Sequence, residues 1–121
     1  MIKIMSDIPD NVLGATGIGK VTGEDYESVL IPAVEAKLKA NKKVRLLYHL
    51  GSSFTGFEMG AVLDDAKMGM KHLTSWERIA LVSDHSMINT FARFFGHMFP
   101  CEVRIYKDAE FEEAKKWIIE K

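Results

Sequence analysis

The feature that most limits the fold of this chain is a short, uninterrupted apolar run at residues 79–82, set between two amphipathic helical patterns. A strand that is apolar at every position is buried on both faces, which is typical of a parallel sheet covered by helices. Four more strand patterns occur at residues 2–5, 12–21, 44–50 and 103–106. Strands that alternate with helices predict a largely parallel sheet with right-handed crossovers.

Four helical patterns accompany these strands. Thr22, followed by two acidic residues, predicts the capped start of the first helix, and Pro32 predicts a kink or break within it. The second pattern, residues 58–73, carries one apolar stripe that we expect to pack on the sheet, formed by Met59, Val62, Leu63, Ala66, Met70 and Leu73. The third covers residues 85–99, and the fourth begins at Asp108, which we expect to cap it.

The resulting order of elements is ββαβαβαβα. We therefore expect an α/β fold in which a mixed, mostly parallel five-stranded sheet carries four main helices. Residues 2–5 form an edge strand and residues 79–82 lie in the interior. No linker or repeat interrupts the pattern, so residues 1–121 are expected to form a single domain.

Composition excludes several classes of function. Of the 121 residues, 16 are Lys or Arg and 17 are Asp or Glu, a net charge of -1 that argues against a nucleic-acid binder. The single cysteine, Cys101, excludes an internal disulfide framework. No apolar run reaches the roughly 18 residues of a membrane span, and the first residues lack a signal-peptide pattern. We expect a cytoplasmic protein.

One glycine-rich segment imitates a phosphate-binding loop. Residues 14–20 match its first seven positions, ending in Gly19-Lys20, but Val21 stands where the motif requires a serine or threonine to hold magnesium. The segment also fails to run directly into a helix. We interpret it as a strand bent by its glycines, and keep a nucleotide-binding enzyme only as an alternative.

A second segment, residues 51–56, is expected to form a polar loop and imitates the nucleophile elbow of serine hydrolases. The glycine required two residues after the nucleophile is displaced by one position if Ser53 is that nucleophile. Asp84 and His85 are the partners that a triad would need, which leaves a hydrolase as the other enzymatic alternative. The histidines, His49, His72, His85 and His97, have no metal-ligand spacing. We expect no catalysis and no cofactor or metal.

The third helix has an unusually wide apolar arc. One stripe, formed by Ile88, Ala92, Phe95 and Phe99, is expected to pack on the sheet. Beside it lies a second stripe, formed by Met87, Phe91, Phe94 and Met98. This second stripe belongs either to a thick core or to a contact between two copies. We predict a homodimer that uses it.

Several segments resemble the SpoIIAA-like family, a STAS/SEC14-like group that shares the fold of anti-sigma-factor antagonists. They are Gly19-Lys20-Val21-Thr22 followed by Asp25-Tyr26, Val44-Arg45-Leu46-Leu47, Glu77-Arg78-Ile79-Ala80-Leu81-Val82-Ser83-Asp84, and Val103-Arg104-Ile105-Tyr106 leading into residues 112–118. The resemblance spans nearly the whole chain. It implies a small bacterial binding or regulatory protein rather than an enzyme. In the antagonists a serine after the central strand is phosphorylated, and Ser52 and Ser53 fall in the corresponding loop here.

Open α/β sheets place ligands at the carboxyl ends of their strands. We therefore expect the binding face at the carboxyl ends of the strands predicted over residues 44–50, 79–82 and 103–106. Its residues are Ser52, Ser53, Phe54, Thr55, Phe57, Ser83, Asp84, His85 and Tyr106. The serines and Thr55 suit a polar group, and the two phenylalanines suit an apolar one. The expected occupant is a protein partner or a small apolar ligand.

Overall fold

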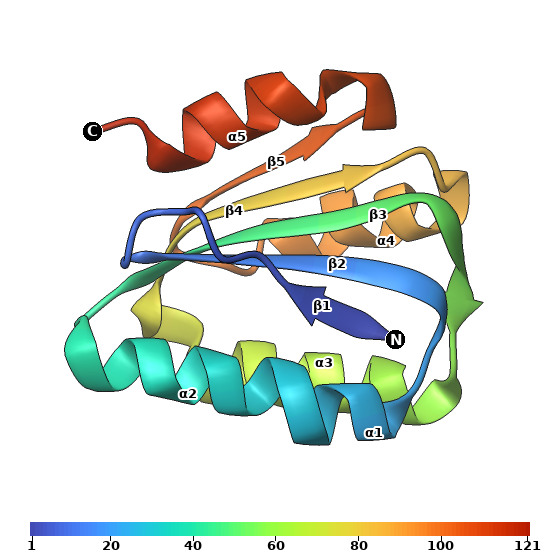
Figure 1. Ribbon diagram of the computed structural model, residues 1–121, viewed down its shortest axis with the longest axis horizontal. Coiled ribbons are helices and arrows are strands. Elements are labelled where there is room, and N and C mark those ends of the chain that lie inside the picture. The colour runs from blue at the N-terminus through green and yellow to red at the C-terminus, as the bar shows by residue number, and fades with distance from the viewer.

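A computed structural model describes all residues, Met1–Lys121. Its five strands form one sheet in the order β1-β2-β3-β4-β5 (Figure 1). β1 is antiparallel to β2, and every other pair is parallel. The bounds are β1 (Ile2–Ile4), β2 (Val12–Val21), β3 (Val44–Phe57), β4 (Trp76–Ser83) and β5 (Glu102–Tyr106). The expected mixed sheet, with β1 at an edge and β4 in the interior, is confirmed.

The helices cover the two faces of the sheet unequally. The first helical segment runs from α1 (Gly23–Asp25) through a π-helical stretch (Tyr26–Leu30) into α2 (Ile31–Ala40). It is followed by α3 (Met59–Lys71), α4 (Ser86–Gly96) and α5 (Phe111–Ile119), with short 3-10 turns at Leu73–Ser75 and Asp108–Glu110. Figure 1 shows α1, α2 and α3 on one side of the sheet and α5 alone on the other.

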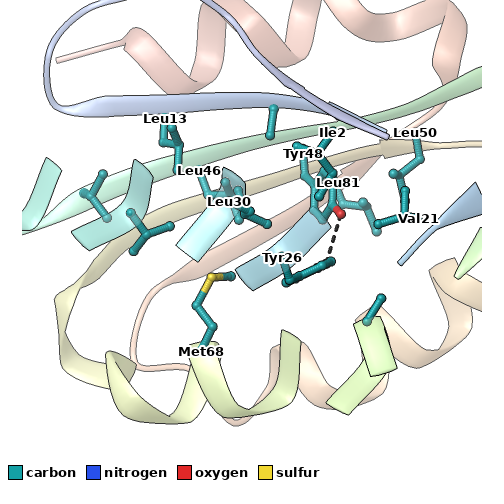
Figure 2. Packing of buried hydrophobic residues seen from close by; sticks show 14 of the residues in the cluster. Ile2, Leu13, Val21, Tyr26, Leu30, Leu46, Tyr48, Leu50, Met68 and Leu81 are labelled. Carbon is teal, nitrogen blue, oxygen red and sulfur yellow. Dashed lines mark hydrogen bonds between the residues drawn. The ribbon is translucent and has the colours of Figure 1, made fainter. Parts of the chain in front are cut away.

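Two apolar cores result from this arrangement. The larger one contains 16 buried residues between the sheet and the helices of the crowded face, among them Leu13, Tyr26 and Leu81 (Figure 2). Ile88, Ala92 and Phe99 pack against it, so α4 belongs to this face as well. The smaller core joins Val12, Leu47, Ala80 and Val82 of the sheet to Ala114, Trp117 and Ile118 of α5.

The first helix begins as its sequence predicts. The Thr22 hydroxyl accepts the Asp25 backbone N–H at 3.2 Å, and the Asp25 carboxylate accepts the Thr22 backbone N–H at 2.8 Å. Pro32 does not break the helix. The turn before it is π-helical, with the Ile31 N–H donating to the Tyr26 carbonyl, and Pro32 then lies in the first turn of α2, where a missing N–H is tolerated.

The strand expected over residues 44–50 is longer than its sequence predicts, and the polar loop expected over residues 51–56 is wrong. β3 continues to Phe57, and its end pairs with Gly19, Lys20 and Val21 of β2. Register shifts between Gly17 and Lys20 mark bulges in this ladder, in the part of β2 that was expected to bend. Phe54 and Phe57 explain the difference, because they pack into the larger core and hold a polar segment in extended form.

The apolar stripe expected to hold the second helix on the sheet faces outward instead. Met59, Val62, Leu63 and Met70 of α3 are all about half exposed or more, whereas Ala61, Met68 and Gly69 are buried. Two contacts fix this rotation. Gly60 of α3 lies directly against Gly23 of α1, and the Asp65 carboxylate accepts the buried Tyr26 hydroxyl at 2.8 Å. Small residues and one hydrogen bond therefore override the apolar pattern.

Candidate functional site

The carboxyl ends of β3, β4 and β5 surround a shallow hollow of about 280 Å³. It is lined by Leu50, Gly51, Ser52, Phe54, Asp84, His85 and Asp108. Of the residues expected at this face, the structure thus brings Ser52, Phe54, Asp84 and His85 together around one depression. Ser83 lies directly beneath, buried at the end of β4.

Short polar contacts tie the strand ends together. The His49 ring Nε2 lies 2.6 Å from the Asp108 Oδ1, and the Asp108 backbone N–H donates to the Asp84 Oδ1 at 3.0 Å. Gly51 permits this approach, because a Cβ there would lie 3.0 Å from the His49 Nε2. The carboxylate of Asp108 therefore binds His49 and does not cap the following helix, as its sequence position had indicated.

His49 is the residue of this site that sequence reasoning missed, because it lies within a strongly apolar strand pattern. Asp108 was placed at this edge by its sequence position, but as a helix cap and not as the partner of His49. The register of the parallel strands supplies the missing signal, because His49 pairs with Val82 and Val82 pairs with Tyr106. Those three positions reach the same edge of the sheet.

The remaining expected residues are divided between surface and core. Ser52, Ser53 and Thr55 are exposed on the irregular end of β3. Phe54 is only 5% exposed and packs edge-on against Phe57 and against the His85 ring, with centroid distances of 5.0 and 5.4 Å. Phe54 therefore forms the floor of the hollow, and Phe57 packs against Phe54 without lining it. Tyr106 turns away toward Trp117, with a centroid distance of 6.4 Å.

The side chains at this edge do not form a hydrolytic arrangement. Neither Ser52 nor Ser53 makes a hydrogen bond to a histidine; His49 pairs with Asp108, and the His85 backbone N–H donates to the Ser83 hydroxyl at 3.0 Å. The two serines also lie well before the start of α3, which follows Glu58. They are thus placed on a strand bulge and not at a helix N-terminus.

The glycine-rich segment at residues 14–20 lies inside β2. It pairs with β1 on one side and β3 on the other, so its backbone is engaged in the sheet and its N–H groups do not form a phosphate cradle. Gly19, with a φ of 61°, accommodates the bulge at its end. The segment is the glycine-bent strand that its sequence indicated.

A broad apolar surface lies on the crowded side of the molecule, over α3 and α4. All four side chains of the expected dimer stripe on α4 are exposed, with Phe94 at 71% and Met87 at 69%. Phe95 was expected on the inner stripe, but it is 48% exposed and packs against Phe91 and Phe94. On the neighbouring helix α3, the outward-facing stripe adds Met59, Val62, Leu63 and Met70.

The two helices meet at their carboxyl ends. A Cβ on Gly69 of α3 would lie 3.3 Å from the ring of Phe99, which follows α4. We call the exposed apolar side chains of both helices the α3/α4 surface; its members are Met59, Val62, Leu63, Met70, Met87, Phe91, Phe94, Phe95 and Met98.

A buried polar network lies beneath α3. The Tyr26 hydroxyl donates to the Asp65 carboxylate and lies 2.9 Å from the Tyr48 hydroxyl, so Tyr48 donates to Tyr26 (Figure 2). Burial, with the charge of Asp65 in support, raises the pKa of Tyr26 well above its usual value. Burial also raises the pKa of Tyr48, against the opposing effect of its bond to Tyr26. Both hydroxyls are therefore un-ionised at neutral pH.

No helix of the structure has the length and apolar character needed to cross a membrane. No group of three or more histidine, cysteine, aspartate or glutamate side chains is placed to bind a metal ion.

Comparison with known proteins places this fold in a family. The family model described as SpoIIAA-like matches residues 12–119, and the chain belongs to that family. A similar solved structure is the crystal structure, at 2.25 Å resolution, of an uncharacterized protein of the DUF3478 family with a SpoIIAA-like fold from Shewanella loihica PV-4. It is 27% identical, with a TM-score of 0.75 over 98% of this chain and 92% of that one. No curated protein matches the chain.

Membership of this family defines the general class of the protein. The SpoIIAA-like fold is in general that of a regulatory or binding module, often one that contacts other proteins, and the family is typically non-catalytic. The resemblance inferred from the sequence is thereby confirmed.

Proposed function

We propose that this protein is a non-catalytic protein-binding module that acts as a homodimer. The observation that carries the proposal is the α3/α4 surface. It exposes nine large apolar side chains, which belong to the helices α3 and α4. Scattered apolar residues on a surface need no explanation, but nine exposed on two helices of the same face of the sheet favour a protein interface.

The size of the α3/α4 surface supports a second copy as its occupant. A large apolar side chain at these exposed fractions offers roughly 100 Å², so the nine together offer on the order of 900 Å². A stable interface buries about 800 Å² on each partner. Because one self-complementary patch suffices for a two-fold dimer, no further surface is needed.

The hollow at the carboxyl edge supports a protein partner more than an enclosed apolar ligand. Its volume of about 280 Å³ falls at or below the range of roughly 300–1,000 Å³ typical of small-molecule sites. Phe54 already fills its floor, and the rim carries exposed polar groups such as Ser52 and Asp84. A polar loop or side chain of a partner protein fits such a depression.

The dimer is tested by cross-linking through single cysteines. Cys101 is the only cysteine, so its replacement by serine provides a clean background. In that background we expect Phe94→Cys to form a disulfide-linked dimer under mild oxidation, because a central residue of a two-fold interface lies near its own copy. Glu113→Cys, exposed on α5 at the other face of the sheet, is the matched control. Equal cross-linking of both variants would contradict the interface.

The partner face is tested by affinity capture from cells of the source organism. We expect to capture a protein that binds the wild type and does not bind the Ser52→Arg variant. Ser28→Arg, which changes an exposed serine of the first helical segment, is expected to retain it. Native mass spectrometry distinguishes the alternative: a small molecule that copurifies and disappears with Ser52→Arg would favour a ligand site instead.

A further inference from the structure

A second hollow, separate from the carboxyl edge and from the α3/α4 surface, lies between α4 and β5. It has a volume of about 510 Å³ and is lined by Ala92, Arg93, Gly96, His97, Phe99, Cys101, Val103 and Ile105. Its strand wall is apolar, and its two nitrogen-bearing side chains, Arg93 of α4 and His97 directly after α4, line the helix side. No acidic residue lines it. We call it the α4/β5 groove.

The strand that borders this groove has a free edge. β5 pairs with β4 alone and ends the sheet, so its outer N–H and C=O groups have no partner strand. Val103 and Ile105 line the groove, whereas Glu102 and Arg104 alternate to the opposite face of the sheet. There Arg104 pairs with Glu102 at 2.6 Å and stacks over Trp117. The charged side chains of this edge strand therefore leave the groove open.

We propose that the α4/β5 groove binds an extended peptide segment of another protein, which adds to β5 as a further strand. Its backbone takes up the free hydrogen-bonding groups of β5, an apolar side chain enters the groove beside Val103 and Ile105, and an acidic side chain meets Arg93 and His97. Main-chain bonds supply affinity in this mode of recognition, and the pocket and charges supply specificity.

The charges of the groove favour an acidic peptide over a second copy of this chain. Pairing of β5 with β5 of another copy around a two-fold axis would place the two α4 helices side by side on one face of a continuous sheet. Each copy would then bring its Arg93 guanidinium toward the α4 helix of the other, with no acidic side chain of the groove to meet it. That arrangement disfavours the contact, whereas an acidic side chain of a peptide complements the charge.

The experiment is selection from a phage-displayed library of random decapeptides on the immobilised protein. We expect the selected peptides to share alternating apolar residues and at least one aspartate or glutamate. A synthetic selected peptide should bind about tenfold more weakly to Arg93→Glu, because the reversed charge repels its acidic side chain. Phe94→Glu, the neighbouring change on the α3/α4 surface, should bind it as the wild type does.

Two further measurements fix the site and the mode of binding. Cys101 lines the groove, so bound peptide should slow its alkylation by iodoacetamide in proportion to occupancy. N-methylation of the backbone amides that pair with β5 should abolish binding, because strand addition requires them. Failure to select any peptide, selected peptides indifferent to Arg93→Glu, or an unchanged alkylation rate of Cys101 with peptide bound would overturn the proposal.

Discussion

At the scale of single residues, the hydroxyl of Tyr26 is the buried polar group that orients α3. Tyr26 is fully buried and bonds both Tyr48 and Asp65. We expect Tyr26→Phe to lower the free energy of unfolding by about 1–3 kcal/mol, because the Tyr48 hydroxyl is then left buried without its partner. Urea denaturation measures the change. Tyr106→Phe, at a half-buried tyrosine outside the network, should cost less; an equal loss in both variants would contradict the role of Tyr26.

The same two tyrosines set a pH limit on stability. Their pKa values are raised in the folded state, so above the usual tyrosine pKa of about 10 the folded chain holds more protons than the unfolded one. Stability is therefore constant with respect to these groups below that pH and falls above it. We expect the melting temperature of the wild type to drop more steeply above pH 10 than that of the Tyr26→Phe, Tyr48→Phe double variant. Parallel pH profiles would refute this.

Side-chain contacts were predictable from the sequence where the partners are close together in the chain. They were missed where the register of the strands brings distant residues together. The Thr22 cap needs only Asp25 three residues later, and the pattern shows it. The contact between His49 and Asp108 joins positions 59 residues apart, and no sequence pattern near either residue indicates it. The expected residues that line the hollow are those that directly follow strand patterns, because the carboxyl ends of parallel strands meet at one edge.

At the scale of elements, α5 is the only helix that covers its face of the sheet. Trp117 is 6% exposed and packs with Ala80 and Val82 in the smaller core. We expect Trp117→Ala to destabilise the fold by about 3–5 kcal/mol, because no other helix can close the cavity that it leaves. Ile119→Ala, at an exposed position of the same helix, should cost far less. Thermal unfolding compares the two; similar melting temperatures would contradict a separate core under α5.

Periodicity predicted the order of the strands and helices, but it missed the second half of β3 and the rotation of α3. The apolar stripe of α3 has the spacing of a core face, yet the buried residues of this helix are Ala61, Met68 and Gly69. Periodicity shows which side of the helix is apolar. The side that faces the sheet is decided instead by the close approach of Gly60 to Gly23 of α1 and by the hydrogen bond from Tyr26 to Asp65. Likewise, Phe54 and Phe57 pack into the larger core and hold the polar end of β3 extended. The polar composition of this segment indicated a loop and gave no sign of that packing.

At the scale of the whole molecule, one face of the sheet is covered by α5 alone. The other face is covered by the remaining helices, and two of these, α3 and α4, expose apolar side chains to solvent. The crowded face buries a core of 16 residues and still exposes the α3/α4 surface. The carboxyl-edge hollow and the α4/β5 groove lie outside that surface. A homodimer formed through α3 and α4 would therefore leave both hollows free to meet other proteins.

Sedimentation velocity of the wild type, Phe94→Glu and Ile119→Glu across a concentration series tests this account most directly. Phe94 is 71% exposed at the centre of the apolar stripe, and a buried, unpaired carboxylate there would oppose association strongly. Ile119→Glu is the matched control, because it makes the same apolar-to-charged change at an exposed position of α5, on the other face of the sheet. We expect the wild type and Ile119→Glu to sediment as dimers at tens of micromolar and Phe94→Glu as a folded monomer. A monomeric wild type, or a Phe94→Glu dimer of unchanged affinity, would contradict the proposed interface.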